Sequence, residues 1–373
     1  MEITCLKENF KKSLNLLERA ITNKPTLPIL RNILLKNDNG KVNLIATDLE
    51  IAVKSWFRAR IEGEDKEITL PFSILNSILF NIPDEKINLK VSEKNMTIIS
   101  QNLKTKIQGI PVDDFPIIPK VKKEKSIKID AQILKEAFNS VSYISSLSSL
   151  KPEISGVLFF LNKDEIEIVS TDSFRLGRKI INANYFKTSL KEEKVKLIIP
   201  LKTVQEYVKI VENLNLNSFI DFYFEENQIL FDFPDVQLIS RLIDGNFPEY
   251  EAVIPKKFDA EVVVKKDELI QFIKLASVFT SRTKDLKFII PENLKNLEIY
   301  SQDINLGENK SYLEGRIKGG KVEITFNYQF VLDGLKPIKN EEVFIGFNQN
   351  NSPSLIKDEE DPSYLYIVMP LKM

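Results

Sequence analysis

Residues 169–176 of the 373-residue chain read VSTDSFRL, and this stretch decides how the rest of the sequence is interpreted. A related stretch, ATDLEI, lies earlier at residues 46–51, and another, YSQDINL, lies later at residues 300–306. Each places β-forming residues, a small polar residue and an aspartate in the same order. The aspartates of the three stretches are 124 and 131 positions apart, which is the length of a typical domain: Asp48, Asp172 and Asp303. The spacing indicates an internal repeat.

Other landmarks recur with the same period. Apolar runs that lead into helical patterns begin at residues 68, 197 and 324, which are 129 and 127 positions apart. Each repeat also opens with a strand-like segment and a helical pattern, at residues 3–21, 127–141 and 262–278. The first two repeats close on the same Phe-Pro pair, at residues 115–116 and 247–248. Landmarks that recur in phase predict a triplicated domain, with repeats at residues 1–122, 123–256 and 257–373.

The residue pattern within a repeat predicts two β-α-β-β-β units. In the first repeat, a helix over residues 7–21 carries apolar residues at helical spacing, namely Phe10, Leu14, Leu17 and Ile21. Pro71 suits the first turn of a second helix. Short β-patterned runs follow each helix, and the sequence DNG at residues 38–40 predicts a hairpin turn. The fold class is therefore α+β, with two helices of each domain packed on antiparallel sheet.

The composition excludes several classes of function. The chain has no histidine and one cysteine, so it has neither a Ser-His-Asp or Cys-His catalytic set nor a histidine or thiolate zinc site. Cys5 lies in a β-patterned run, where we expect a small buried side chain rather than a reactive thiol. The 52 basic and 53 acidic residues nearly balance, so any contact with a polyanion must come from a local patch.

The distribution of apolar residues predicts the compartment. The start of the sequence has no apolar run of signal-peptide length, and the longest apolar runs, such as residues 157–161, are much shorter than a membrane span. A single cysteine is unable to form an intramolecular disulfide. We therefore expect a protein of the reducing cytoplasm that contacts no membrane and needs no metal or cofactor.

Several short motifs have a functional and a purely structural interpretation. Residues 315–321 match the phosphate-loop pattern G-x-x-x-x-G-K, but Val322 replaces the magnesium-binding hydroxyl and β-patterns flank both sides, so we expect a hairpin turn. The three repeated aspartates would lie far apart in separate domains, so we expect them to cap turns. The acidic run at residues 358–361 lacks the spacing of a calcium loop and is interpreted as a solvated loop. The last strand-like run, residues 364–370, fits either an edge strand of the third sheet or the border of an apolar groove.

In their order and spacing, the motifs of the whole chain resemble those of the bacterial sliding clamp family, the β subunit of DNA polymerase III. The resemblance is carried by TLPIL at residues 26–30, ATDLE at 46–50, TDSFRL at 171–176, NFP at 246–248 and VMP at 368–370. It implies three clamp domains per chain and two chains joined head to tail in a ring around duplex DNA, with helices lining the hole and sheets outside. Such a ring performs no chemistry and tethers a polymerase by topology. A head-to-tail contact that closes on itself also hides the sheet edges at its joints.

The resemblance also implies sequence-independent contacts with DNA phosphates, because base-specific bonds would hold a sliding ring in place. Lys24 stands where the family has a basic DNA contact, and Lys202 is a similar candidate on the second helix of the middle repeat. The sequence departs from the family in two places. Leu201 occupies a place that is basic in some relatives, and Pro152-Glu153 replaces an aromatic pair that touches DNA.

For partner proteins, the resemblance implies a groove between the second and third domains. The groove binds short peptides of the type Gln-Leu-(Ser/Asp)-Leu-Phe from the polymerase α subunit, other polymerases, the clamp loader and repair proteins. Apolar walls would take the leucine and phenylalanine, and Arg175 and Asn327 would hold peptide carbonyls. The matching positions are Ile154, Thr171, Ser173, Phe174, Arg175, Leu176, Pro248, Val253, Asn327, Phe330, Ile367, Val368, Met369, Pro370 and Leu371.

Four of these positions differ from the family. Ser173-Phe174 replaces a common Gly-His pair, Phe330 replaces a tyrosine and Leu371 replaces a methionine, so we expect an altered peptide preference. For the joint between subunits, the family places the outer edge of repeat one against that of repeat three. Ile107, Val278 and Phe279 fall at matching places, although the spacing of Val278 fits the core of its own helix equally well.

Two other functions fit parts of the sequence. One is an enzyme that uses carboxylates and magnesium on a triplicated α+β scaffold, and the other is a β-rich interaction scaffold with no role on DNA. The absence of histidine and of any clustered acidic motif argues against the enzyme. The main hypothesis is a non-catalytic processivity factor that acts as a homodimer.

Overall fold

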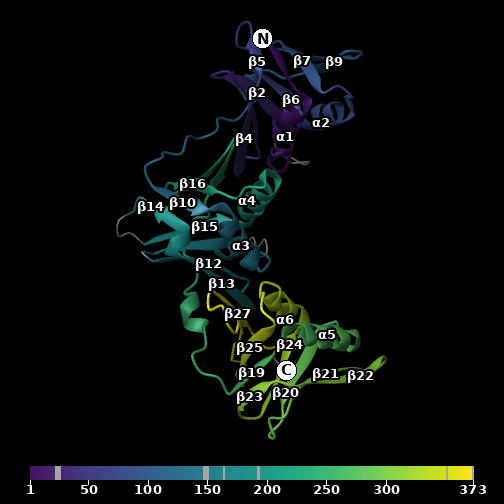
Figure 1. The fold of residues 1–373 in the computed structure, drawn as a ribbon, viewed down its shortest axis with the longest axis vertical. Coiled ribbons are helices and arrows are strands. Elements are labelled where there is room, and N and C mark those ends of the chain that lie inside the picture. Colours follow the sequence, from purple (N-terminus) through teal and green to yellow (C-terminus); the bar gives the residue numbers. More distant parts are fainter. Residues whose placement is uncertain are drawn as a thin grey trace. The chain divides into compact units, whose positions relative to one another are not determined.

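The computed structural model describes residues 1–21, 27–145, 151–162, 164–190, 194–280, 282–349 and 352–371. Over this part of the chain one order of elements recurs three times: a strand, a helix, five strands, a second helix and three strands (Figure 1). The triplication and the two β-α-β-β-β units of each repeat are therefore confirmed. Each repeat has one short strand more than the sequence predicts, namely β5, β14 and β23.

The first repeat comprises β1 (Glu2–Leu6), α1 (Lys7–Asn15), β2 (Asn32–Asp38), β3 (Lys41–Thr47), β4 (Ile51–Arg58), β5 (Arg60–Glu62), β6 (Ile68–Pro71), α2 (Phe72–Asn81), β7 (Lys86–Val91), β8 (Asn95–Ile99) and β9 (Lys104–Gln108). The second comprises β10 (Ser126–Asp130), α3 (Ala131–Val141), β11 (Gly156–Leu161), β12 (Glu165–Thr171), β13 (Arg175–Asn182), β14 (Phe186–Thr188), β15 (Val195–Pro200), α4 (Leu201–Leu214), β16 (Phe219–Phe224), β17 (Gln228–Phe233) and β18 (Val236–Arg241). The third comprises β19 (Ala260–Lys265), α5 (Lys266–Ala276), β20 (Asp285–Ile290), β21 (Leu297–Asp303), β22 (Gly307–Leu313), β23 (Arg316–Gly319), β24 (Val322–Asn327), α6 (Tyr328–Leu335), β25 (Glu342–Phe347), β26 (Ser354–Asp358) and β27 (Tyr364–Val368).

The first helix shows how the apolar stripe becomes a core. Phe10, Leu14 and Leu17 are each fully buried, and the Phe10 ring lies 5.5 Å from the Phe57 ring of β4. Burying one such side chain stabilises the fold by about 1.5–3 kcal/mol. The helix ends at Asn15, earlier than predicted, because the backbone N–H groups of Leu17 and Ala20 bond three residues back and tighten the chain into a short 3₁₀ turn.

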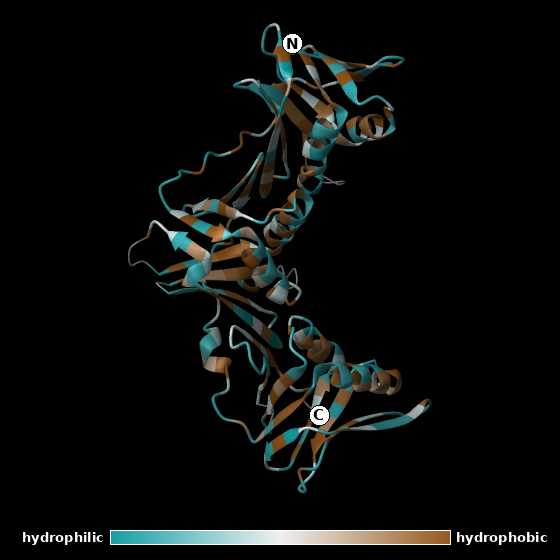
Figure 2. Ribbon diagram, viewed as in Figure 1, coloured by the Kyte–Doolittle hydropathy of each residue, from teal (hydrophilic) through white to brown (hydrophobic). Residues whose placement is uncertain are grey.

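Some strands, such as β7 and β8, alternate between buried and more exposed residues, whereas β11 and β27 are buried throughout. Apolar and polar positions form bands along the ribbon (Figure 2). The predicted turn at residues 38–40 is confirmed. Asn39 and Gly40 have φ values of 54° and 76°, which is the geometry of a two-residue turn that matches the twist of the hairpin formed by β2 and β3. Cys5 is buried in β1, as expected, and burial raises the pKa of its thiol to about 12.

Two nine-stranded sheets each join strands from two repeats. One has the order β14-β10-β16-β17-β18-β4-β3-β2-β6, and the other has the order β15-β11-β12-β13-β27-β26-β25-β19-β23. The joining pairs are antiparallel in both sheets: β18 with β4 in the first, and β13 with β27 in the second. The outer strands of the first and third repeats form smaller sheets, β5-β1-β7-β8-β9 and β22-β21-β20-β24.

The chain forms two compact units, and their boundary passes through the middle repeat. Unit 1 comprises residues 1–132, 186–191 and 205–242, and unit 2 comprises residues 133–185, 192–204 and 243–373. Each nine-stranded sheet lies within one unit. In unit 2, α5 and α6 pack side by side (Figure 1). Asn327 caps the first turn of α6 by accepting a hydrogen bond from the Gln329 N–H. No helix in the described ranges has the length and apolar character that crossing a membrane requires.

One prediction about a single segment is wrong, and one of the two interpretations of the last strand is excluded. Residues 315–321 do not form a hairpin turn, because β23 within them pairs with β19 while the following β24 pairs with β20, so the segment connects two sheets. Gly319 has a φ of 105°, and a side chain there would overlap the carbonyl oxygen of Asp259. The last strand is not an edge strand, since β27 lies between β13 and β26.

The acidic run is more ordered than predicted, and the lysine-rich linker at residues 120–125 is likewise held by contacts with the fold. Asp358 is 4% exposed and accepts hydrogen bonds from the Asn340 side chain and from the N–H groups of Glu360 and Asp361. In the linker, Lys123 forms an ion pair of 2.5 Å with Asp232 and lies over the Tyr223 ring. These segments are therefore held against the fold rather than fully solvated.

Candidate functional site

The turn between β12 and β13 is fixed by its own side chains. The Thr171 hydroxyl donates to the Arg175 carbonyl oxygen at 2.8 Å and accepts from the Ser173 N–H at 3.2 Å. Asp172 Oδ1 accepts from the N–H groups of Phe174 and Arg175, both at 2.9 Å. These bonds hold Ser173 at a φ of 75°, a value that residues other than glycine seldom adopt. The turn leaves the Phe174 side chain outside, 63% exposed, and directs Arg175 into the unit.

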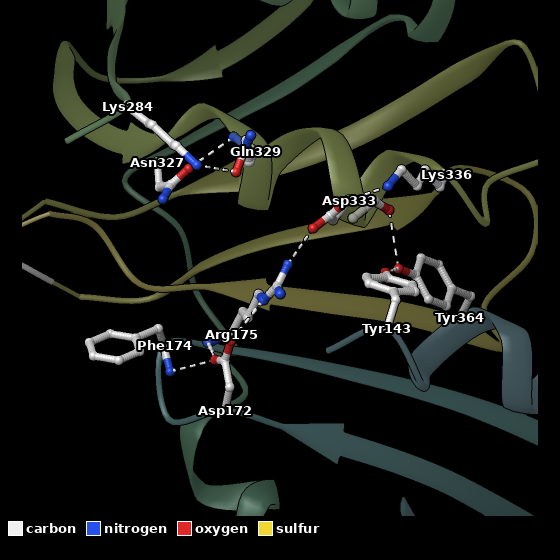
Figure 3. Close-up of polar contacts among 11 residues, drawn as sticks. Tyr143, Asp172, Phe174, Arg175, Lys284, Asn327, Gln329, Asp333, Lys336 and Tyr364 are labelled. Atoms are coloured by element: carbon white, nitrogen blue, oxygen red, sulfur yellow. Dashed lines mark hydrogen bonds and ion pairs between the residues drawn. The ribbon is translucent and has the colours of Figure 1, made fainter. Parts of the chain in front are cut away.

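Arg175 is held from two repeats at once (Figure 3). Its Nε donates to Asp172 Oδ2 at 2.9 Å, and its Nη1 donates to Asp333 Oδ2 of α6 at 2.5 Å. The guanidinium carbon lies 4.3 Å from the centre of the Phe330 ring, one helical turn before Asp333. With 11% of its side chain exposed, Arg175 is a fixed wall rather than a mobile surface cation.

The charges around Arg175 balance. Burial works against the guanidinium charge, but the adjoining Tyr366 and the hydrogen bonds to Asp172 and Asp333 outweigh it, and the pKa of Arg175 is raised. The second oxygen of Asp333 pairs with Lys336 Nζ at 2.5 Å (Figure 3). Asp333 therefore joins the buried guanidinium to an exposed lysine, and the wall carries no unpaired buried charge.

The strand β27 forms the second side of the site. Arg175 pairs with Val368 and Leu176 with Ile367 in an antiparallel register. Beyond the strand, the Met369 N–H donates to the Phe174 carbonyl oxygen at 2.8 Å. Because side chains alternate along a strand, Ile367 packs in the apolar cluster with Leu176 and Tyr250, whereas Val368 packs in the core of the third repeat.

These elements enclose a cavity of about 170 Å³ in unit 2. Its lining is mostly apolar, with Arg175 and Glu249 as its charged members. The predicted residues that line it are Thr171, Ser173, Phe174, Arg175, Leu176, Pro248, Val253, Ile367 and Met369. The cavity therefore brings together the turn, the Phe-Pro segment after β18 and the last strand.

The remaining predicted groove residues lie outside this cavity. Ile154 is buried in the 3₁₀ turn Pro152–Ile154, Val368 faces the core, and Asn327 caps α6. Phe330 contributes through Arg175, on which its ring is stacked. Pro370 and Leu371 continue past β27, where the Leu371 N–H donates to the Thr325 carbonyl oxygen at 2.8 Å.

Sequence reasoning missed several residues that shape the cavity. Glu249 and Tyr250 line it, and the Tyr250 hydroxyl donates to Glu167 Oε2 at 3.0 Å. Burial raises the pKa of Glu167, although Arg178, 3.4 Å away, opposes the rise. Asp333 was also missed. Its spacing of three residues from Phe330 on a helical pattern was the available signal, because that spacing places two side chains on one face.

The residues predicted for DNA and for the subunit joint have different surroundings. Lys24 lies outside the described residues, and Lys202 is half-buried in the first turn of α4. Ile107 is only 3% exposed in β9, whereas Val278 is 60% exposed, so Val278 does not belong to the core of its own helix. Phe279 is half-buried, and its ring lies beside Gly307, where a side chain would touch it.

The lining of the cavity determines which contacts it can offer. Within the described ranges, no three acidic or cysteine side chains are grouped so that they would hold a metal ion. The cavity presents a fixed guanidinium, apolar side chains and the peptide backbone of a turn. Such a lining suits an extended peptide with apolar side chains.

Three tandem α+β domains, joined through shared nine-stranded sheets, define a sliding clamp. Models of the three domains of the DNA polymerase III beta subunit match this chain in order: the N-terminal domain at residues 1–119, the central domain at 128–249 and the C-terminal domain at 251–372. The chain belongs to the DNA polymerase III beta subunit family.

Full-length relatives and solved structures agree with this assignment. The chain is 27% identical over 397 residues to the beta sliding clamp of Synechocystis sp., with 100% of each chain covered. It is 26% identical over 382 residues to that of Staphylococcus epidermidis, covering 100% of this chain and 99% of the relative. The crystal structure of the DNA polymerase III beta subunit from Thermotoga maritima matches with a TM-score of 0.89 at 26% identity, over 100% of this chain and 99% of that one. A Pseudomonas aeruginosa sliding clamp bound to griselimycin shares the fold, with a TM-score of 0.92 at 23% identity over 100% of both chains.

Proposed function

We propose that this protein encircles duplex DNA as a head-to-tail homodimer and tethers the replicative polymerase to it. The observation that carries this proposal is the agreement along the whole chain with clamps of known structure, at a TM-score of 0.89 for the Thermotoga maritima protein. In this proposal the protein is a processivity factor without catalytic activity, and it works in the cytoplasm. Its domains extend over residues 1–122, 123–256 and 257–373.

The ring requires complementary surfaces at the two ends of the chain. The third repeat exposes apolar side chains on α5, the turn after it and the loop joining β21 to β22: Leu275, Val278, Ile304 and Leu306. The first repeat exposes Ile74 and Phe80 on α2, and β9 is the last strand of its sheet. The strand β22 is likewise the last strand of its sheet. We propose that the β9 and β22 edges of two copies meet, with Ile107, Val278 and Phe279 at the joint.

Contact with DNA would depend on phosphates alone. A sliding ring needs cations that attract the backbone of the duplex without reading its bases. We propose Lys24 and Lys202 for this role. The near balance of charge over the whole chain supports a local contact rather than a general attraction to polyanions.

The cavity beside Arg175 is proposed as the site for partner peptides. Its volume of about 170 Å³ suits one leucine-sized or phenylalanine-sized side chain of an extended segment. The polymerase α subunit, other polymerases, the clamp loader and repair proteins would each present such a segment. Arg175, whose Nε and Nη1 are bonded to Asp172 and Asp333, acts here mainly as a rigid wall.

Retention on circular DNA tests the ring. Protein loaded by a clamp loader on nicked circular DNA is expected to stay bound in moderate salt, where phosphate contacts alone weaken. Cutting the circle once with a restriction enzyme is expected to release the protein from the free ends. Equal loss from the circular and the linear DNA would overturn the proposal. A monomeric mass in solution at micromolar concentration would also count against it.

A further inference from the structure

A second site lies in unit 1, at a place where β4 extends beyond its neighbour. The pairing of β18 with β4 begins at Val236 and Ser55, so Trp56 and the two residues after it pair only with β3. The Trp56 N–H donates to the Asp235 carbonyl oxygen at 3.0 Å, and this bond closes the pairing. Beyond it lies a cavity of about 470 Å³, which we call the basic cleft.

The basic cleft carries unbalanced positive charge. Its lining includes Lys12 of α1, Lys41 of β3 and Arg58 of β4, with Asp235 as its carboxylate. Among the described residues, none forms an ion pair with any of these three cations. Lys12 and Arg58 are exposed, so their charges are available to a ligand.

A cavity of the same volume in unit 2 is also lined by several lysines, but these lysines are paired with carboxylates. It is also about 470 Å³ and is lined by Lys179, Lys336 and Lys339. There each lysine has a carboxylate partner: Lys179 bonds Asp361 at 3.0 Å, Lys336 bonds Asp333 at 2.5 Å and Lys339 bonds Glu136 at 2.9 Å. The cations of that cavity are neutralised within the protein, whereas those of the basic cleft have no such partner in the described part of the chain and favour an anionic ligand.

The basic cleft also contains the only tryptophan of the chain. Lys41 Nζ lies 5.6 Å from the centre of the Trp56 ring, and the ring is half-buried. Leu16 and Leu214 add apolar lining. Cations next to a flat aromatic ring form the combination that binds a phosphate and an unstacked base together.

We propose that the basic cleft binds one or two nucleotides of single-stranded nucleic acid, with a base on Trp56 and phosphates on Lys12 and Arg58. In a duplex the bases stack on one another and leave no face for Trp56, so the site selects a single strand. The inference extends the DNA role proposed above. A clamp with such a site holds the unpaired strand near a primer junction in addition to the duplex it encircles.

Fluorescence of the single tryptophan gives a direct test. The full-length protein is titrated with an oligothymidylate of about six nucleotides, within the range that single-strand sites occupy. We expect saturable quenching, with an affinity that falls as salt rises by roughly 0.7 logarithmic units per tenfold salt for each phosphate bound. Inorganic phosphate alone is expected to quench far less. Equal quenching by phosphate and by the oligonucleotide would overturn the proposal that a base stacks on the Trp56 side chain.

Variants distinguish binding at the basic cleft from general electrostatic attraction to the protein. Binding of a labelled oligothymidylate, followed by anisotropy, is expected to weaken roughly tenfold in Trp56→Ala and to be retained in Trp56→Phe, since a base stacks on either ring. Lys12→Ala/Arg58→Ala is expected to weaken binding at least as much. The control Lys86→Ala/Lys94→Ala removes the same charge from exposed lysines that do not line the cleft.

Several results would overturn the proposal: no binding, equal loss in the control, or equal affinity for a duplex of the same length. The oligonucleotide is too short to require encirclement. Failure here would therefore leave the release of protein from cut circular DNA as an independent test of the ring.

Discussion

The turn at Thr171 in unit 2 has a counterpart at Thr47 in unit 1. The two turns share a backbone geometry but differ in the side chains around them. In unit 1 the Thr47 hydroxyl donates to the Ile51 carbonyl oxygen and accepts from the Leu49 N–H, and Asp48 Oδ1 accepts from the N–H groups of Glu50 and Ile51. The turn in unit 2 makes the same four bonds at positions 124 residues later. Leu49 and Ser173 share a positive φ, 79° and 75°. The two backbones are thus equivalent.

Each turn also borders a cavity built in the same way. In unit 1 the cavity is lined by the turn, by the Pro-Ile-Ile-Pro segment at residues 116–119 and by the end of β18. In unit 2 the matching elements are the turn, the Phe-Pro segment and the end of β27. The unit 1 cavity measures about 80 Å³ and the unit 2 cavity about 170 Å³.

The difference lies in a few side chains. Ile51 stands where unit 2 has Arg175, Glu50 stands in place of Phe174, and Arg241 stands in place of Met369. The guanidinium of Arg175 ties the turn to α6, whereas Ile51 is simply buried. The two units therefore share one scaffold, and different side chains on it line cavities of about 80 Å³ and about 170 Å³.

Replacing the guanidinium should have the largest effect. In Arg175→Met, Asp172 and Asp333 lose their shared partner, and we expect the affinity for a polymerase-derived peptide to fall at least about tenfold. The matched change Ile51→Val in unit 1 is expected to leave peptide affinity unchanged and to cost about 0.5–1.5 kcal/mol of stability. Peptide titration by calorimetry measures the first effect and urea unfolding the second.

A double-mutant cycle sharpens this prediction. If Asp333 acts by positioning Arg175, Asp333→Asn should weaken peptide binding in the wild-type background and have little further effect in Arg175→Met. Additive losses would instead mean that Asp333 acts independently of the guanidinium.

Removing a turn carboxylate should have an effect of intermediate size. The loss of stability should be similar in the two units, whereas the loss of peptide affinity should occur in unit 2 alone. Asp48→Ala and Asp172→Ala each leave two backbone N–H groups without their acceptor, so we expect each to cost about 1–3 kcal/mol of stability. Only Asp172→Ala also frees Arg175 Nε, and only this variant is expected to weaken peptide binding. Equal peptide affinities of the two variants would contradict the distinction between the cavities.

The smallest effect concerns the pH dependence of Glu167, whose place in unit 1 is taken by Asn43. Because burial raises the pKa of Glu167 in the folded state, its contribution to stability is fully present below its unfolded pKa of about 4.3 and is lost as pH rises through the folded pKa. The neutral variant Glu167→Gln should therefore gain stability relative to wild type between pH 4 and pH 7. Urea unfolding at both pH values measures the change, and Asn43→Ala, which alters no charge, should show none.

The repeat could be predicted because it rests on local patterns. Apolar stripes such as Phe10, Leu14 and Leu17, and turn residues such as Asn39-Gly40, report their own conformation. The middle repeat divides between two units because β18 pairs with β4 and β13 pairs with β27. Local patterns do not predict this division, because the paired strands lie far apart in the sequence. The position of the last strand could not be predicted for the same reason, because its residue pattern is the same whether the strand lies at the edge or in the interior of a sheet.

Most residues that line the unit 2 cavity were named from the sequence, but the hydrogen bonds between them were not. Resemblance identified Arg175 and placed it against peptide carbonyls, whereas two of its donors are bonded to Asp172 and Asp333. A hydrogen bond between residues 158 positions apart leaves no trace in the spacing of a single sequence. The basic cleft was missed for the same reason, since Lys12 lies on α1 whereas Trp56 and Arg58 lie on β4.

The position of β27 inside its sheet has a consequence for biosynthesis. Val368 pairs with Arg175 from 193 positions further along the chain. During translation, the strand that lines the unit 2 cavity therefore leaves the ribosome long after the turn has emerged. A nascent or prematurely terminated chain that lacks residues 364–368 has no complete cavity, so under the proposed function only a chain translated through this strand would recruit a partner.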